Sequence, residues 1–469
     1  MTPAHVDPQV FSAYLDRTRW FGGKGRPYGV TDVRTIGELP GGPPRVVIHV
    51  VEVTYADAEG GTELYQVPLA FYEHPAGRLD HAFVGWWEDP DHGWVHAYDA
   101  LHDRDAMALW QRAFDAAAGE GVLDSGGLRF HRLPGHELDL EEHSTLFAGE
   151  QSNSSVAYGT DALMKVFRKV TPGMNPDIAV HEVLTRAGST HVPALYGWLD
   201  APLGEGTDDV LQLAMLQQFL RTASDGWDLA LASVRSLFAD PEVHASESGG
   251  DFAGEATRLG EALRDVHAAL REHFASETRL ASAAAELAAT MTGRLEAALS
   301  VVPELEEHAK GLRGAFDEVA HLDGLEVQQV HGDLHLGQTL RTSVGWKIVD
   351  FEGEPAKPLA ERQLPDSPWR DVAGMLRSFD YAARVVERSL SISDESDAEL
   401  ISTRAEEWSE RNKNHFLVAY AGGALAPEQQ VLLNAYVADK AVYETVYETR
   451  NRPSWVTIPL QAVARIGAA

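Results

Sequence analysis

The sequence predicts an α+β protein in which a β-rich first part is followed by a mainly helical second part. Up to about residue 220, runs of β-branched and aromatic residues separated by turn signals dominate the chain. From about residue 226, apolar residues instead recur at helical spacing, as in Leu259, Leu263, Val266 and Leu270. This order indicates a small lobe and a large helical lobe, and a cleft between two such units is the usual place for a ligand.

The first hundred residues are expected to open with a short helix over 7–18 and to continue as strands. Residues 45–55 (RVVIHVVEVTY) and 63–72 (ELYQVPLAFY) are two strand-forming runs, and ADAEGG between them is a turn signal. The simplest interpretation is a β-hairpin.

A second β segment is predicted over 144–170, where small polar residues separate two strand-like runs. The next segment, PDIAVHEVLTRAG, begins with Pro176 and ends at Gly188, which is the punctuation of a short helix. Residues 209–220 (DVLQLAMLQQFL) are expected to form a buried strand.

The second half is predicted to be helical to about residue 450, with one β-like interlude from Val327 to Phe351. Residues 280–320 are rich in the helix formers Ala and Glu. The Ser-rich, acidic stretch 389–399 (SLSISDESDAE) is expected to be a solvated loop.

Composition excludes several classes of function. The formal net charge is −32, from 71 acidic and 39 basic residues, so a general basic field for nucleic acid or an anionic membrane surface is not expected. The chain has no cysteine, which excludes disulfides, thiolate zinc sites and a cysteine nucleophile. No signal peptide and no apolar run of membrane-spanning length is evident, and a cytoplasmic location is expected.

The segment VHGDLHLGQTL (330–340), followed by KIVDFEGEP (347–355), carries the strongest chemical signal. Phosphoryl transfer needs a carboxylate beside the attacking hydroxyl and ligands for the Mg²⁺ ion that bridges the phosphates. Asp333 lies in a predicted sharp loop, Gln338 follows five residues later, and a short strand leads to Asp350. Amide and carboxylate oxygens suit Mg²⁺, so the segment predicts a kinase active site.

These motifs resemble the catalytic and metal-binding loops of aminoglycoside phosphotransferase-type kinases, which show HGDxHxxN followed by DxD. The resemblance implies that Asp333 is the catalytic base, that Gln338 and Asp350 bind the metal, and that Glu352 takes the place of the second acid. Gln for Asn and Glu for Asp keep the ligand type and lengthen the reach. The flanking His331 and His335 are expected to shape the loop, and His331 is also a candidate sugar contact.

A kinase also needs a cation on the phosphates of ATP. Lys165 lies in a predicted strand and is expected to contact them and to pair with Glu182 on the next helix. Arg168 or Lys169 could substitute for it. The turn before this strand lacks G-x-G-x-x-G, so the phosphate contacts are assigned to Ser152, Asn153 and Ser154.

Two further segments are candidates for nucleotide binding. Gln217 and Phe219 fall where the hinge between two lobes would bind adenine, although an ordinary strand end fits equally well. RWFGGKGR (19–26) has three glycines but neither the spacing nor the Ser/Thr of a Walker A loop, so it is interpreted as a turn.

The chain as a whole closely resembles actinobacterial maltokinases. The matching segments are RWFGGKGR (19–26), EQSNSSV (150–156), MKVFRKV (164–170), NPDI (175–178), GGDFAGE (249–255), VHGDLHLGQ (330–338), DFEGEP (350–355), SPWRDVAGMLRSFDYAA (367–383) and DKAVYETVYETRNRPSW (439–455). The resemblance implies a bilobal protein-kinase-like fold. Its expected parts are an N-terminal β-rich cap (1–98), a β-sheet nucleotide-binding subdomain (99–220) and a helical C-terminal lobe (221–469).

The resemblance also implies ATP- and Mg²⁺-dependent formation of maltose 1-phosphate, which would feed α-glucan (glycogen) synthesis. Trehalose synthase, which supplies maltose, is a family-level candidate partner. Within SPWRDVAGML, Arg370 and Asp371 are expected to brace the catalytic loop as an Arg–carboxylate pair.

The C-terminal segment offers a surface for the sugar. Lys440, Tyr443, Tyr447 and Arg450 would share one face of a helix, where aromatic rings and polar heads suit a disaccharide. The alternative is that the two tyrosines are core residues with cations at the edge. On the same segment, Glu444 and Glu448 are expected to pair with Lys440 or Arg452, or to face solvent.

Three functions remain open at this point: a maltose kinase, a kinase of another small sugar such as glucosamine, and a non-catalytic pseudokinase. The joint presence of Asp333, Gln338 and Asp350 argues against the third.

Overall fold

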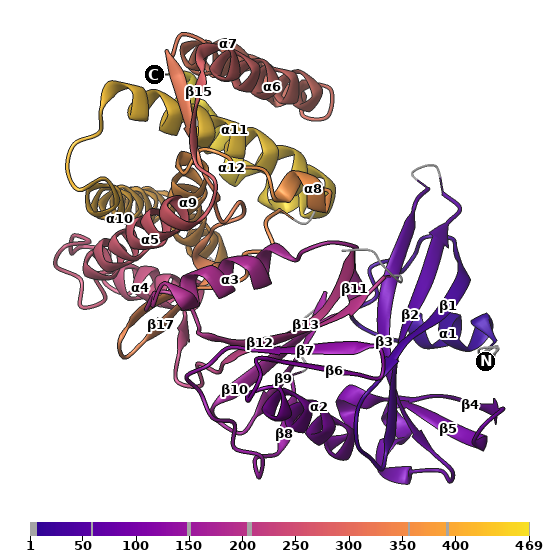
Figure 1. Ribbon diagram of the computed structural model, residues 1–469. Coiled ribbons are helices and arrows are strands. Elements are labelled where there is room, and N and C mark those ends of the chain that lie inside the picture. The colour runs from indigo at the N-terminus through magenta and orange to yellow at the C-terminus, as the bar shows by residue number, and fades with distance from the viewer. Residues whose placement is uncertain are drawn as a thin grey trace. The chain divides into compact units, whose positions relative to one another are not determined.

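The computed structural model describes residues 7–57, 60–147, 152–203, 209–354, 357–390 and 394–468 (Figure 1). The chain forms two compact units. The first comprises Met1–Glu182 and Pro193–Arg221, and the second comprises Val183–Val192 and Thr222–Ala469.

The first unit opens with helix α1 (Pro8–Leu15), whose N-terminus is capped by the Asp7 carboxylate and begins with a proline. A six-stranded antiparallel sheet follows, in which β11 pairs with β3 beside the order β1-β2-β3-β5-β4. Its strands are β1 (Tyr28–Glu38), β2 (Arg45–Tyr55), β3 (Thr62–Tyr72), β4 (Phe83–Asp89), β5 (Gly93–Asp99) and β11 (Lys169–Val170). The β2–β3 pair, in register from Arg45↔Phe71 to Thr54↔Thr62, confirms the predicted hairpin.

A seven-stranded antiparallel sheet completes this unit, in the order β6-β7-β12-β13-β10-β9-β8. Its strands are β6 (Val122–Ser125), β7 (Leu128–Arg132), β8 (Ser144–Leu146), β9 (Asn153–Tyr158), β10 (Ala162–Phe167), β12 (Leu195–Pro202) and β13 (Val210–Gln218). The helical segments are η1 (Gly77–Ala82), η2 (Ala100–His102), α2 (Arg104–Ala116) and the part of α3 (Pro176–Arg186) that ends at Glu182. The predicted strands in 144–170 and 209–220 and the helix that starts at Pro176 are confirmed.

A shared core explains why the first two hundred residues form one unit. Ile48 of the first sheet, Trp110 of α2 and Met164 of the second sheet belong to one continuous buried cluster. Phe114 of α2 meets Phe130 of β7 edge to face, with ring centroids 5.3 Å apart. The predicted separation of residues 1–98 from 99–220 stays a prediction.

The second unit is mainly helical (Figure 1). Its helices are α4 (Gly226–Phe238), α5 (Ala253–His273), α6 (Ala281–Leu299), α7 (Ala309–Val319), α8 (Leu359–Arg362), α9 (Trp369–Ser389), α10 (Glu395–Ala421), α11 (Pro427–Asn451) and α12 (Thr457–Ala468). Shorter elements are β14 (Ser224–Asp225), β15 (Glu277–Leu280), β16 (Gly324–Val327), β17 (Thr339–Thr342), β18 (Gly345–Ile348), η3 (Pro303–His308), η4 (Leu336–Gln338) and η5 (Pro453–Trp455). Helix α9 contacts α4, α10 and α11, and α11 in turn contacts α6, α7 and α12.

The predicted apolar face of α5 is confirmed, because Leu259, Leu263, Val266 and Leu270 are all buried. The expected loop over 389–399 is wrong at its C-terminal end. Residues 395–399 belong to α10, whose first turn is stabilised by the Asp394 cap and by Glu395 and Asp397 near the positive end of the helix dipole. Residues 391–393 lie outside the described residues. None of the helices that the structure describes has the length and hydropathy needed to cross a membrane.

Candidate active site

The predicted catalytic loop connects β16 to η4 and leads directly into the β17–β18 hairpin. Gly332 turns the loop with φ +86, a conformation that L side chains rarely adopt. After the hairpin, the Val349 N–H donates to the Gln338 carbonyl at 3.0 Å. This closure places Gln338 beside Asp350, and the Gln338 amide donates to Asp350 Oδ2 at 3.1 Å.

Asp350 has an unusual backbone conformation. Its φ of +68 makes it the only non-glycine residue with positive φ in the described ranges of the chain. Such a conformation costs about 1–3 kcal/mol and is concentrated at functional sites. The two neighbouring side chains offer hard oxygen donors, which fit a Mg²⁺ ion. Glu352 follows two residues later, is half-buried, and its backbone carbonyl accepts from Arg362.

Asp371 of α9 holds the catalytic loop, which confirms the expected brace, although the carboxylates that pair with Arg370 are those of Asp366 and Glu354 and not that of Asp371. Its carboxylate accepts the backbone N–H groups of His331 at 2.7 Å and Gly332 at 2.8 Å. Burial opposes ionisation of Asp371, but the hydrogen bond from His267 and the backbone donors lower its pKa below the ordinary value. Arg370 adds a bond from Nε to the Gly332 carbonyl at 3.2 Å.

Two close contacts fix the rest of the loop against α9. The Ser378 hydroxyl accepts the Leu336 N–H at 3.0 Å. Gly374 faces the Leu334 carbonyl so closely that a Cβ at this position would lie 2.4 Å from that oxygen. Only glycine therefore allows α9 to approach the loop.

The two loop histidines shape the backbone, as expected. His335 Nδ1 accepts the Gly337 N–H at 3.1 Å. His331 is only 2% exposed, its Nε2 lies 2.9 Å from the Val349 carbonyl, and its Nδ1 accepts the Asp333 N–H. Because burial and these two bonds occupy the ring, the predicted sugar contact of His331 is wrong.

Asp333 meets a residue of α11 that is distant in sequence. Lys440 Nζ donates to Asp333 Oδ1 at 3.2 Å, and both side chains remain partly exposed. Burial alone would raise the pKa of Asp333, but the charges of Lys440, His335 and His331 lower it below the ordinary value. Asp333 is therefore ionised near neutral pH and can accept a hydrogen bond or a proton.

Helix α11 presents the predicted aromatic face to solvent. Tyr443 is 38% and Tyr447 43% exposed, and their rings stack with centroids 6.3 Å apart. Lys440 Nζ lies 5.3 Å from the Tyr443 ring centroid. Burial and the charges of Glu354 and Asp333 raise the pKa of Tyr443 to about 12, so this ring lies near both carboxylates. The alternative that these tyrosines are core residues is wrong.

The opposite face of α11 is buried and differs from the expectation. Glu444 pairs with Arg377 of α9 at 2.6 Å instead of Lys440, Arg452 or solvent, because α9 packs against this face. Glu448 pairs with Arg452, as expected. Arg450 is exposed in the last turn, and no bond between it and another described residue was found.

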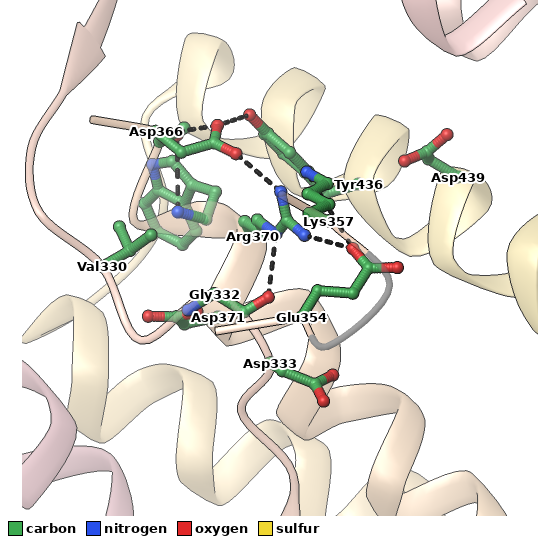
Figure 2. A network of polar contacts seen from close by, with 12 residues as sticks. Val330, Gly332, Asp333, Glu354, Lys357, Asp366, Arg370, Asp371, Tyr436 and Asp439 are labelled. Carbon is green, nitrogen blue, oxygen red and sulfur yellow. Dashed lines mark hydrogen bonds and ion pairs between the residues drawn. The ribbon is translucent and has the colours of Figure 1, made fainter. Parts of the chain in front are cut away.

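A network of polar contacts borders the catalytic loop (Figure 2). Arg370 bridges Asp366 and Glu354, each at 2.9 Å, and the Tyr436 hydroxyl donates to Asp366 at 2.7 Å. On the same helix as Tyr436, Asp439 forms a two-bond pair with Arg294 at 2.8 and 2.7 Å. Sequence reasoning missed this network, although Tyr436 lies seven residues before Tyr443 and so shares its helix face.

In the first unit, Lys165 of β10 donates to Asp177 of α3 at 2.9 Å. Burial would raise the pKa of Asp177, but Lys165 and His181 lower it well below the ordinary value. Sequence reasoning missed this role of Asp177, which it took only as a signal for the start of a helix. The predicted pairing of Lys165 with Glu182, which is half-buried, stays a prediction. The two alternative cations are engaged elsewhere, since Arg168 pairs with Asp99 and Lys169 with Glu63.

The predicted phosphate loop lies partly outside the described residues, which omit 148–151. Ser152 is exposed, whereas Asn153 and Ser154 are buried at the start of β9. Lys165 lies opposite Ser155 and Val166 lies opposite Ser154, so the side chains of Lys165 and Ser154 project from opposite faces of the sheet. The predicted phosphate contact of the Ser154 side chain beside Lys165 is therefore wrong. At the predicted hinge, Gln217 lies in β13 between β10 and β12. The Phe219 N–H donates to the Asp161 carbonyl at 2.7 Å, so an adenine contact could use the Phe219 carbonyl but not its N–H.

Residues 14–103 match the family model described as the maltokinase N-terminal cap domain. The chain is 31% identical over 326 residues to a glucosamine kinase of Streptacidiphilus jiangxiensis, a match that covers 66% of this chain and 70% of the relative. It is 25% identical over 378 residues to a glucosamine kinase of Mycolicibacterium smegmatis (strain ATCC 700084 / mc(2)155), covering 76% and 90%.

Solved structures agree on the fold. A glucosamine kinase in complex with glucosamine, ADP and inorganic phosphate superposes with a TM-score of 0.69 at 22% identity, over 99% of this chain and 100% of that chain. Crystal form B of a glucosamine kinase superposes with a TM-score of 0.71 at 23% identity, over 99% and 98%. The predicted α+β kinase-like fold, with a β-rich N-terminal region and a helical C-terminal part, is confirmed.

Proposed function

Because the chain belongs to the family of sugar kinases that includes the glucosamine kinase of Streptacidiphilus jiangxiensis, and carries the maltokinase N-terminal cap, we propose that it is a maltokinase. It transfers the γ-phosphoryl group of ATP to the anomeric hydroxyl of maltose and releases maltose 1-phosphate and ADP. The observation that carries this proposal is the contact between Asp333 and Lys440 beside the stacked rings of Tyr443 and Tyr447.

Asp333 acts on the acceptor sugar. Its lowered pKa keeps the carboxylate ionised, so it accepts a hydrogen bond or the proton from the anomeric hydroxyl. Lys440 holds Asp333 Oδ1 and offers its remaining donors to sugar hydroxyls.

The exposed rings of α11 bind the sugar. Aromatic faces match the apolar faces of pyranose rings, and two stacked rings in sequence suit a disaccharide better than one hexose. Arg450, on the same helix, is the proposed hydrogen-bonding group beyond the second ring.

The contacts with ATP and Mg²⁺ are assigned to residues from several segments of the sequence. Lys165, oriented by Asp177, neutralises phosphate charge, and Glu182 supports it. Ser152 and Asn153 contact the phosphates, while Gln217 and Phe219 contact adenine. Gln338, Asp350 and Glu352 would hold Mg²⁺, which when bound supplies positive charge against the phosphates of ATP.

Glucosamine is the second candidate substrate, because the relatives named above are glucosamine kinases. Its ammonium group would need an available carboxylate. In this chain the acids beside the α11 face are each paired with a cation: Asp333 with Lys440, Glu354 with Arg370, and Asp439 with Arg294. These pairings favour a neutral sugar.

The test is a coupled ADP-release assay with Mg²⁺-ATP against maltose, glucose, glucosamine, trehalose and no sugar, with Asp333→Asn as the control. Turnover on maltose that disappears in the variant is expected. Turnover on glucosamine alone would replace the substrate and keep the kinase, while no turnover on any sugar would favour a pseudokinase. We further propose that the product feeds α-glucan (glycogen) synthesis in the cytoplasm, with trehalose synthase as a partner that supplies maltose.

A further inference from the structure

The first unit contains a cavity whose cationic side chains the proposed kinase reaction does not use. Its volume is about 430 Å³, within the range of small-ligand sites, and it lies where the segment after α1 meets η1, η2 and the start of β9. The side chains that matter for its chemistry are Arg17, Arg19, Trp20, His81, His102 and Arg168. Arg19 and Trp20 belong to RWFGGKGR, the cation-rich motif that is not a Walker A loop.

The charged side chains that line this cavity are basic, although the chain as a whole is acidic. The protein has 71 acidic and only 39 basic residues, yet the described residues that line the cavity include three arginines and two histidines and no acid. Arg17 and Arg19 are exposed, whereas Arg168 is only 1% exposed. Arginine side chains therefore line the cavity from its solvent side to its buried side, where Asp99 balances the charge of Arg168.

Arg168 has an unmet donor. Its Nη2 donates to Asp99 at 2.7 Å, its Nε donates to the Ser154 hydroxyl at 2.8 Å, and its guanidinium lies 4.6 Å from the Trp20 ring centroid. Its Nη1 is buried and has no hydrogen-bond partner among the described residues. A buried charged donor without a partner is costly, and an anion in the cavity would satisfy it.

We propose that this cavity binds the phosphate group of a small molecule. Arginine forks match phosphate oxygens with pairs of parallel hydrogen bonds, and three arginines suit a dianion better than a carboxylate. The Ser154 hydroxyl, which accepts from Arg168 Nε, keeps its own proton to donate to a phosphate oxygen.

This site is separate from the nucleotide-binding lysine. In the β9–β10 pair, Lys165 lies opposite Ser155, whereas Ser154 lies opposite Val166. Because successive side chains of a strand point to opposite faces, Lys165 and Ser154 project from opposite faces of the sheet. Arg168 bonds to Ser154 and so lies on the face away from Lys165.

The test is calorimetric titration of the full chain, saturated with ADP, using inorganic phosphate and, separately, glucose 6-phosphate. We expect phosphate to bind and Arg17→Gln/Arg19→Gln to weaken binding about tenfold or more, the loss typical of one charge-assisted hydrogen bond. Tighter binding of glucose 6-phosphate would identify a phosphate monoester as the ligand, and equal binding would identify free phosphate. Arg34→Gln, an exposed arginine of β1 paired with Asp32 and Glu52, is the matched control and should bind normally.

Thermal unfolding provides a second readout. Phosphate should raise the Tm of the wild-type protein and of Arg34→Gln but not of the double variant, because a ligand that binds only the folded state stabilises it. Phosphate binding that is lost on adding ADP, that is unchanged in the double variant, or that is absent at millimolar phosphate would overturn the proposal. Sugar phosphorylation without added phosphate is expected to be unchanged in the double variant, so failure here is distinguishable from failure of the proposed kinase activity.

Discussion

Lys440 Nζ donates to Asp333 Oδ1 at 3.2 Å across 107 residues of sequence. The pair joins the catalytic loop to the helix that carries the aromatic face, and it positions the carboxylate on which the proposed chemistry depends. The first two predictions test this pair.

Asp333→Asn should lower kcat by about two to four orders of magnitude, because removal of a positioned base typically costs that much. The Kd of ATP should stay nearly unchanged, since Asp333 is assigned to the acceptor sugar. Single-turnover kinetics and equilibrium nucleotide binding would measure the two effects. Near-normal turnover in the variant would refute the assignment.

Lys440→Met should change the pH dependence of the reaction. Burial raises the pKa of Asp333, and the charges of Lys440 and the two loop histidines lower it overall. Loss of the lysine charge should raise the pKa again, so the acid limb of kcat/KM should move to higher pH. Lys440→Arg keeps the charge and should leave the limb close to its original place. An unshifted limb in Lys440→Met would mean that the lysine does not tune Asp333.

Tyr443→Ala and Tyr447→Ala should each raise the KM for maltose by about three- to tenfold, as expected for loss of an aromatic contact worth about 0.5–1.5 kcal/mol. Both rings are more than one third exposed, so the Tm should change little. Tyr→Phe at the same positions keeps the ring face and should retain most of the affinity. A fall in Tm without a change in KM would assign these rings to folding instead.

Asp371→Asn should destabilise the protein at neutral pH and less so in acid. The pKa of Asp371 is lowered in the folded state, where burial opposes ionisation but His267 and two loop N–H groups favour it. Its stabilising contribution is therefore fully present above the unfolded pKa of about 4 and is lost as pH falls through the folded value.

Urea unfolding of wild type and Asp371→Asn between neutral pH and about pH 2 would measure this difference, because the loss falls below the unfolded pKa. The gap in the free energy of unfolding should narrow toward the acid end. A gap that stays constant with pH would show that Asp371 acts by packing alone. Asp397→Asn, in the exposed first turn of α10, is the control and should show only a small gap.

Gly374→Ala should destabilise the second unit by about 1–3 kcal/mol, because its Cβ would meet the Leu334 carbonyl 2.4 Å away and push α9 from the catalytic loop. It should also lower kcat. For Gly314→Ala in α7, no described atom beyond the adjoining residues and turns of the helix lies within 4 Å of the new Cβ, so this substitution should instead stabilise by about 0.4–1 kcal/mol. Equal effects of the two substitutions would contradict the close approach.

The order of strands and helices could be predicted because it depends on local patterns. The β2–β3 hairpin follows from two strand-forming runs around a turn signal, and the buried face of α5 follows from its 4-3-4 spacing. The prediction of a loop over 389–399 was wrong from Asp394 onward, where this residue caps a helix. The same Ser- and Asp-rich composition favours both loops and helix starts.

The sequence by itself determined which residue types could perform phosphoryl transfer, because Asp333, Gln338 and Asp350 lie within one short stretch of chain. Only the tertiary structure decided which distant groups act on them: Lys440 pairs with Asp333, and Asp371 holds the backbone of the loop. It also decided that Arg377 is the partner of Glu444. Such pairs lie far apart in sequence and leave no periodic signature. They form because α9 and α11 pack together, and that packing is set by apolar burial over the whole unit and not by any local run of residues.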